Sequence, residues 1–109
     1  MKKIIFAYML ILTATFKVAA SSSFSTDSNQ VHRVYVTPDG AIALQLKGGF
    51  PRANEAKQCP GNNGWAGLRT GDPVLKSVII AAKSSGQSLT VTTLGCEGAW
   101  IKILNLYLD

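Results

Sequence analysis

The sequence predicts a single small domain that is mainly β with one helix, and three observations support this class. The chain has 109 residues, 47% of them hydrophobic, which suffices for one core and leaves no room for a second domain. Five short stretches alternate in polarity or are rich in β-branched and aliphatic residues, as strands are. One further stretch repeats its apolar residues at helical spacing. The expected order is strand, strand, strand, helix, strand, strand.

The first twenty residues have the pattern of an export signal. Lys2 and Lys3 precede an apolar run over residues 4–16, which is too short to span a bilayer. Small residues at 18–20 predict cleavage after Ala20 and hence a secreted or periplasmic protein without a membrane span. An uncleaved anchor or a buried core helix is the alternative interpretation.

The next ten residues, 21–30, are polar and lack hydrophobic periodicity. We therefore expect a flexible N-terminal segment followed by a single domain over residues 31–109. This leaves roughly 80 residues to build a core, a size at which a domain folds alone with a thin margin of stability.

The domain is expected to begin with a hairpin. Residues 32–37 alternate in polarity, which places Val34 and Val36 on the inner face. Residues 38–40 (Pro-Asp-Gly) form a tight turn, and residues 41–47 return as a second strand. The inward residues expected of this strand are Ile42, Leu44 and Leu46.

A long loop and a short strand are expected next. Residues 48–64 are rich in Gly, Pro and Asn, which predicts a loop without regular structure. Residues 65–69 are apolar enough for a third strand. A proline directly after Asp72 then predicts a helix with Asp72 as its N-cap, and Gly86 is expected to end it. The apolar stripe of this helix is Leu75, Val78, Ile79 and Ala82.

The last two strands are predicted over residues 88–94 and 99–108 because both are rich in β-branched or aliphatic residues. Both faces of the final strand are apolar, so we expect one face to pack on the core and the other on a second subunit of a homo-oligomer. The complete order is that of the OB-fold, a five-stranded, partly open barrel. A split α/β sandwich has the same order of elements and is the alternative fold.

Cys59 and Cys96 are the only cysteines. In an exported chain such a pair predicts one disulfide, which would close a loop of about 37 residues and contribute about 4 kcal/mol to stability. A zinc site is the alternative, but the pair and the lone His32 do not supply four ligands. No cofactor or metal is expected.

Catalysis finds little support in the sequence. His32, the one candidate general base, opens the first strand and is expected to be an exposed edge residue. A small hydrolase would require two of the six carboxylates to meet in a cleft. These are Asp27, Asp39, Glu55, Asp72, Glu97 and Asp109. We therefore expect a non-enzymatic protein.

The second half of the chain carries a resemblance to a known family. The residues concerned are Asp72-Pro73, Ala81-Ala82, the Ser85–Leu89 run Ser-Gly-Gln-Ser-Leu, Thr90-Val91, Cys96 and the Ile101-x-Ile103 strand. Over about residues 70–106 the chain resembles the cell-binding B subunits of bacterial pentameric toxins, above all the subtilase-cytotoxin B-subunit-like group. The resemblance implies an OB-fold protomer with one disulfide, assembled in a ring, that recognises host glycans or glycoproteins and carries a catalytic A-type subunit.

Candidate ligand-binding residues follow from where OB-folds bind oligosaccharides, namely the face of strands two and three and two of the loops. Carboxylates, hydroxyls and flat aromatic rings are the groups that recognise sugars. The candidates are Tyr35, Thr37, Asp39, Trp65 and Glu97. Trp100 opens the final strand and is expected in the core, and Asp39 has an alternative role as a turn residue.

The charge distribution argues against a nucleic-acid ligand. The chain carries a net charge of +5 from 11 basic and 6 acidic residues, but three of the lysines lie in the export signal. The rest, with eight basic and six acidic residues, has a net charge of only +2, which provides little attraction for a polyanion. We expect a glycan-binding protein. The alternative is a monomeric periplasmic interaction module or enzyme inhibitor, in which the loop over residues 48–64 extends from the domain to contact the target protein.

Overall fold

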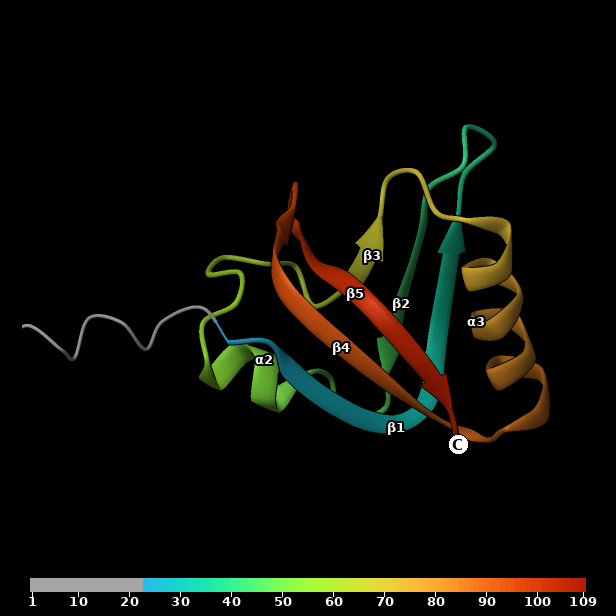
Figure 1. Cartoon of the computed structure of the whole chain (residues 1–109), viewed down its shortest axis with the longest axis horizontal. Helices are drawn as coiled ribbons and strands as arrows, with labels where there is room; N and C mark the ends of the chain where they lie inside the picture. The colour runs from blue at the N-terminus through green and yellow to red at the C-terminus, as the bar shows by residue number, and fades with distance from the viewer. Residues whose placement is uncertain (1–22) are drawn as a thin grey trace, which may run out of the picture.

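The protein folds as a five-stranded barrel (Figure 1). The structure is a computed structural model that describes residues 23–109. The predicted export signal over residues 1–20 lies outside these residues. The elements are β1 (Ser25–Val36), β2 (Ile42–Leu46), α2 (Pro51–Glu55), β3 (Ala66–Leu68), α3 (Pro73–Ser85), β4 (Ser88–Glu97) and β5 (Trp100–Leu108). The predicted β-rich class is therefore confirmed.

The strands close into a ring in the order β1-β2-β3-β5-β4. β3 pairs with β5 in parallel through Ala66↔Ile101 and Gly67↔Lys102, and the other neighbours are antiparallel. The ring closes because β1 pairs with β4 through its first half and with β2 through its second half. Strand order and helix position together give the OB-like barrel that the sequence predicts.

The expected flexible segment over residues 21–30 is wrong for the part that the structure describes. Ser25 to Gln30 form the first half of β1 and pair with β4. Polar side chains do not prevent this because the strand is held by its backbone and by side-chain hydrogen bonds. The Gln58 amide donates to the Ser23 carbonyl at 2.7 Å and to the Ser25 hydroxyl at 2.9 Å.

The predicted β1–β2 hairpin is confirmed, with one correction. Ile42, Leu44 and Leu46 of β2 lie in the core as expected, and Val34 packs against it. Val36, expected to face inward, is 55% exposed. It ends β1 next to the turn, where the hairpin extends beyond the core of the barrel (Figure 1).

Helix α3 has the predicted limits and inner face. The Asp72 carboxylate accepts a hydrogen bond from the Val74 N–H at 2.7 Å, which caps the first turn. Gly86 ends the helix in the left-handed conformation. Ile79 and Ala82 are fully buried, and Leu75 and Val78 pack against the core.

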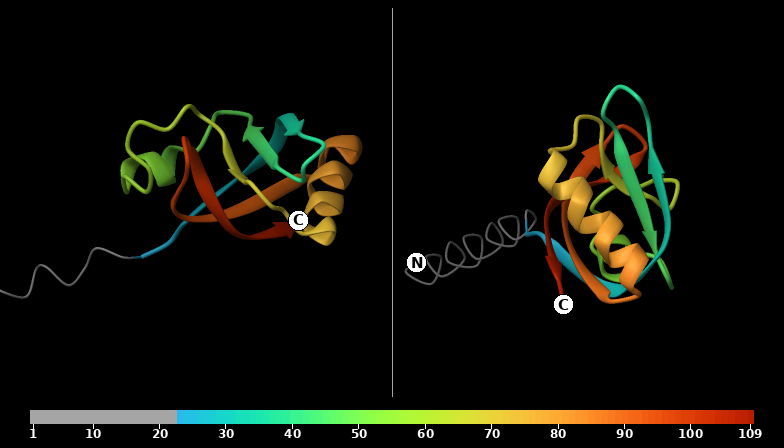
Figure 2. Two further views of the ribbon diagram at one scale, coloured as in Figure 1. Left: turned by 90° about the horizontal axis from the view of Figure 1, so that it is seen from above. Right: turned by 90° about the vertical axis from the view of Figure 1, so that its right-hand side faces the viewer.

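The predicted loop over residues 48–64 contains a short helix, α2, which lies on the opposite side of the barrel from α3 (Figures 1 and 2). Phe50 and Ala53 are buried in the core, so the segment packs against the barrel and does not extend from it. Neither helix among residues 23–109 has the length and apolar character needed to cross a bilayer.

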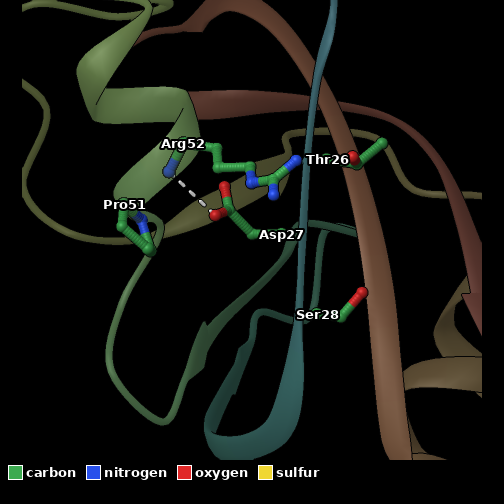
Figure 3. A pocket seen from close by; sticks show the side chains of 5 residues that line it. All are labelled: Thr26, Asp27, Ser28, Pro51 and Arg52. Carbon is green, nitrogen blue, oxygen red and sulfur yellow. Dashed lines mark hydrogen bonds between the residues drawn. The ribbon is translucent and has the colours of Figure 1, made fainter.

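α2 could not be predicted locally because its cap comes from β1. Both carboxylate oxygens of Asp27 accept hydrogen bonds, from the Arg52 N–H at 2.8 Å and the Ala53 N–H at 3.1 Å. Figure 3 shows Asp27 pointing from β1 toward the first turn of this helix. Asp27 is only 6% exposed, and these bonds satisfy its buried charge.

The fully buried residues of β5 lie in its first half, which differs from the expected division into a core face and an exposed face. Ile101 and Ile103 lie in the core, whereas Leu104, Tyr107 and Leu108 are exposed. β4 also runs three residues beyond its predicted end, to Glu97, and forms a two-residue hairpin with β5. The exposed apolar half of β5 therefore lies near the C-terminus of the chain.

We predict that Asp27→Ala lowers the free energy of unfolding by about 2 to 3 kcal/mol, because two backbone N–H groups of α2 lose a charged acceptor at a buried site. Urea denaturation measures the loss. Asp72→Ala is the matched control, since it removes an exposed cap worth about 1 kcal/mol. Equal losses in the two variants would contradict the role assigned to Asp27.

Candidate functional site

Three aromatic side chains from different parts of the barrel line an open surface pocket of about 320 Å³. We call it the aromatic pocket, and it is lined by Tyr35, Asn63, Trp65 and Trp100. Tyr35 comes from β1 and Trp100 from the first position of β5. Asn63 and Trp65 come from the segment that leads into β3. The volume is at the lower end of the range for ligand pockets.

The rings are arranged edge to face around Tyr35. Its ring centroid lies 6.1 Å from that of Trp65, at an interplanar angle of 67°, and 6.0 Å from that of Trp100, at 74°. Such pairs contribute about 0.5 to 1.5 kcal/mol beyond the burial of their area. The arrangement is therefore held by the rings themselves before any ligand arrives.

Two arginines flank the rings. The guanidinium carbon of Arg33 lies 5.2 Å from the centroid of Trp65, and that of Arg69 lies 5.8 Å from the centroid of Trp100. Both are cation–π distances. Each guanidinium brings hydrogen-bond donors close to one of the two indole rings that line the aromatic pocket.

A network of hydrogen bonds positions the segment that carries Asn63 and Trp65. The Asn63 N–H donates to the Ala99 carbonyl at 3.1 Å, and the Ile101 N–H donates to the Trp65 carbonyl at 2.9 Å. The side-chain oxygen of Asn63 also accepts from the Trp65 N–H at 3.3 Å. These bonds join the segment to the start of β5, and so place Trp65 and Trp100 on the same rim.

The predicted disulfide between Cys59 and Cys96 is present. It ties the same segment to the end of β4, since Cys59 precedes Asn63 by four residues and Cys96 lies in β4. The Asn62 amide donates to the Cys59 carbonyl at 2.8 Å and continues the connection toward the pocket. The disulfide thus anchors the loop that carries half of the aromatic pocket.

Gly67 allows Trp100 to lie against β3. A Cβ at this position would stand 2.5 Å from the Ile42 carbonyl oxygen, 2.7 Å from the Ala43 Cβ and 2.8 Å from Cε3 of Trp100. Only a residue without a side chain fits at such distances. Gly67 therefore permits both the strand pairing and the position of the indole.

The structure brings two of the five candidate residues together and leaves three apart. Tyr35 and Trp65 meet in the aromatic pocket. Trp100, expected in the core, is only partly buried and lines the pocket with them. Asn63, Arg33 and Arg69 were not predicted. The clustering depends on the barrel's closure, which has no signature in the spacing of these residues.

Thr37 and Asp39 belong to the turn between β1 and β2. The Thr37 hydroxyl accepts from the Ala41 N–H at 3.1 Å. It also donates to the Asp39 carboxylate, and together with the backbone N–H of Asp39 it holds the pKa of Asp39 below the ordinary value of 3.8. The turn role considered for Asp39 therefore accounts for its contacts.

Glu97 also has a structural contact. Its carboxylate accepts a hydrogen bond from the Arg69 N–H at 3.1 Å, which joins the β4–β5 turn to the residue that follows β3. His32 is exposed on β1, as expected. Among residues 23–109, no three His, Cys, Asp or Glu side chains gather in a group that could hold a metal ion.

A second pocket, of about 370 Å³, lies beside α2 and is called the polar pocket below. Its lining residues are Thr26, Asp27, Ser28, Pro51 and Arg52 (Figure 3). Two of its polar groups are already engaged within the protein: Asp27 caps α2, and the Ser28 hydroxyl hydrogen-bonds the Thr90 hydroxyl at 2.6 Å. The polar pocket has no aromatic lining on which an apolar ligand face could stack.

Comparison of the chain with protein-family models, with curated proteins and with solved structures found no match. The class of the protein therefore rests on its fold and its pockets. It is a disulfide-linked OB-like barrel with an aromatic pocket on its surface.

We predict that replacing both cysteines with serine lowers the free energy of unfolding by about 2 to 4 kcal/mol and changes the tryptophan fluorescence, because the loop that carries Trp65 loses its anchor. Urea denaturation and emission spectra measure the two effects. Wild-type protein reduced with dithiothreitol is the control and should behave like the double variant. Alkylation of both thiols in unreduced protein would contradict the prediction.

Proposed function

We propose that the protein is an exported, non-enzymatic binding protein that recognises carbohydrate through its aromatic pocket. The observation that carries this proposal is the convergence of Tyr35, Trp65 and Trp100 around one surface cavity. Large aromatic side chains are usually buried in a domain of this size, yet here Tyr35 is 47% exposed and the two indoles are only partly buried.

The chemistry of the aromatic pocket suits a sugar. A pyranose ring has an apolar face of C–H groups that packs on an indole, and hydroxyls at its edge that need hydrogen-bond partners. The Asn63 amide, the Tyr35 hydroxyl and the flanking guanidinium groups are such partners. A cavity of about 320 Å³ favours a ligand of one or two rings, such as the terminal part of a glycan.

The resemblance of residues 70–106 to toxin B subunits supports the same class of ligand. It also supports a ring-shaped homo-oligomer and a catalytic A-type partner subunit. The export signal predicted over residues 1–20 supports a periplasmic or extracellular location, where glycans and glycoproteins are accessible.

The alternative function as an interaction module depended on residues 48–64 reaching outward. This segment instead packs on the barrel through Phe50, which is 1% exposed, and Ala53, which is fully buried. An inhibitor that uses a protruding loop is therefore the weaker hypothesis.

We predict that the oxidised mature protein binds defined spots on a glycan array and that Trp65→Ala weakens this binding about tenfold or more, because the loss of a stacking ring costs about 1.4 kcal/mol or more. Arg52→Ala, in the polar pocket, is the matched control and should bind as the wild type does. Loss of binding in Arg52→Ala but not in Trp65→Ala would place the ligand elsewhere and overturn the assignment to the aromatic pocket.

We further predict that the mature protein is a homo-oligomer, because Leu104, Tyr107 and Leu108 expose apolar surface on β5. Multi-angle light scattering should give a mass several times that of one chain, and Leu104→Lys should reduce it. Ile80→Lys, at an exposed apolar position on α3, is the control. A monomer at micromolar concentration would refute the prediction.

A further inference from the structure

Arg69 is an exposed residue whose guanidinium nevertheless lies over the Trp100 ring. It follows β3 directly, is exposed, and places its guanidinium carbon 5.8 Å from the centroid of the Trp100 ring. An exposed arginine normally samples many rotamers, and holding it in one place costs conformational entropy. The position of Arg69 over the ring therefore requires an explanation from its surroundings.

The β4–β5 turn supplies that explanation at both ends of the residue. The backbone N–H of Arg69 donates to the Glu97 carboxylate at 3.1 Å. The guanidinium occupies the space beside Gly98 in which a side chain would stand. A Cβ there would collide with Nη2 of Arg69 and lie 3.2 Å from its Cζ and Nε. Glu97 thus holds the backbone of Arg69, and the missing side chain of Gly98 makes room for its head group.

The arginine over Trp65 is not placed in this way. Arg33 lies 5.2 Å from the centroid of Trp65 and belongs to β1 itself. No glycine has its Cβ position occupied by Arg33 among residues 23–109. The two arginines are chemically alike, so Arg33 is a matched comparison for the effect of the turn.

We infer that Gly98 is a positioning residue for the aromatic pocket: it leaves room for the Arg69 guanidinium over Trp100, where the N–H groups of that guanidinium donate hydrogen bonds to the bound sugar. This inference rests on the proposed function and adds one residue to the site, Gly98, which acts through Arg69. A planar group with several donors, fixed beside a ring, matches the adjacent oxygen atoms of a sugar.

Gly98→Asn tests this inference because it adds a Cβ where the guanidinium lies. The φ of Gly98 is +66°, and Asn is among the L-residues that best tolerate positive φ. Any remaining strain in the turn is measured by combining Gly98→Asn with Arg69→Ala, since in that background the added side chain has no guanidinium to displace. Gly98→Ala is the second variant, with the same added Cβ.

The first measurement needs no ligand. We expect the ring current of Trp100 to shift the resonances of the Arg69 side-chain protons upfield, because the guanidinium lies over the indole. Gly98→Asn should remove this shift and leave that of Arg33 over Trp65 unchanged. A persistent Arg69 shift in both Gly98 variants would overturn the positioning role of Gly98.

The second measurement compares all variants on the glycan array spots that wild type binds. Gly98→Asn and Arg69→Ala should each weaken binding about three- to tenfold, the range for one net hydrogen bond, and the double variant should be no weaker than Arg69→Ala. Unchanged binding after loss of the ring-current shift would overturn the ligand contact of Arg69. If wild type binds no spot, the proposed function fails together with that contact, while the NMR result still decides the role of Gly98.

Discussion

The short parallel pairing of β3 with β5 is the constraint on which the rest of the structure depends. Two residue pairs, Ala66↔Ile101 and Gly67↔Lys102, connect the β2 side of the sheet with the β4 side and close the ring. The same pairing sets Trp65 and Trp100, each next to a paired residue, on one rim. It is possible only because Gly67 lets the Trp100 ring and the Ile42 carbonyl approach the backbone of β3. The same strand pairing therefore closes the barrel and forms the aromatic pocket.

A strand of three residues is a weak closure by itself, and the surrounding contacts compensate for its length. The disulfide holds the segment before β3 to the end of β4, and the hydrogen bonds of Asn63 and Ile101 hold it to the start of β5. Arg69, directly after β3, is held by the turn between β4 and β5 through Glu97. Each cross-connection lies close to the aromatic pocket. The contacts that reinforce this short strand thus lie in the region proposed to contact a ligand.

The surroundings of α2 are organised differently. There the buried carboxylate of Asp27 joins the first half of β1 to α2, and Phe50 and Ala53 fill the core beneath the helix. Asp27 and Ser28 of the polar pocket already have hydrogen-bond partners within the protein, whereas the aromatic pocket presents aromatic rings and the Asn63 amide. The proposed function rests on the aromatic pocket because its groups can still contact a ligand.

The sequence by itself determined the elements whose signals are local. The alternation in β2, the Asp72 cap, the stripe ending at Ala82 and the single cysteine pair each depend on neighbouring residues or on composition, and the structure confirms all four. The tertiary structure alone decided what depends on distant partners: the strand formed by the polar residues 25–30, α2 with its cap from β1, and the exposure of Val36. The pocket belongs to the second group. Tyr35 and Trp65 were candidates by residue type, but Trp100, Asn63 and Arg69 joined them only because closing the barrel brings together residues far apart in the chain.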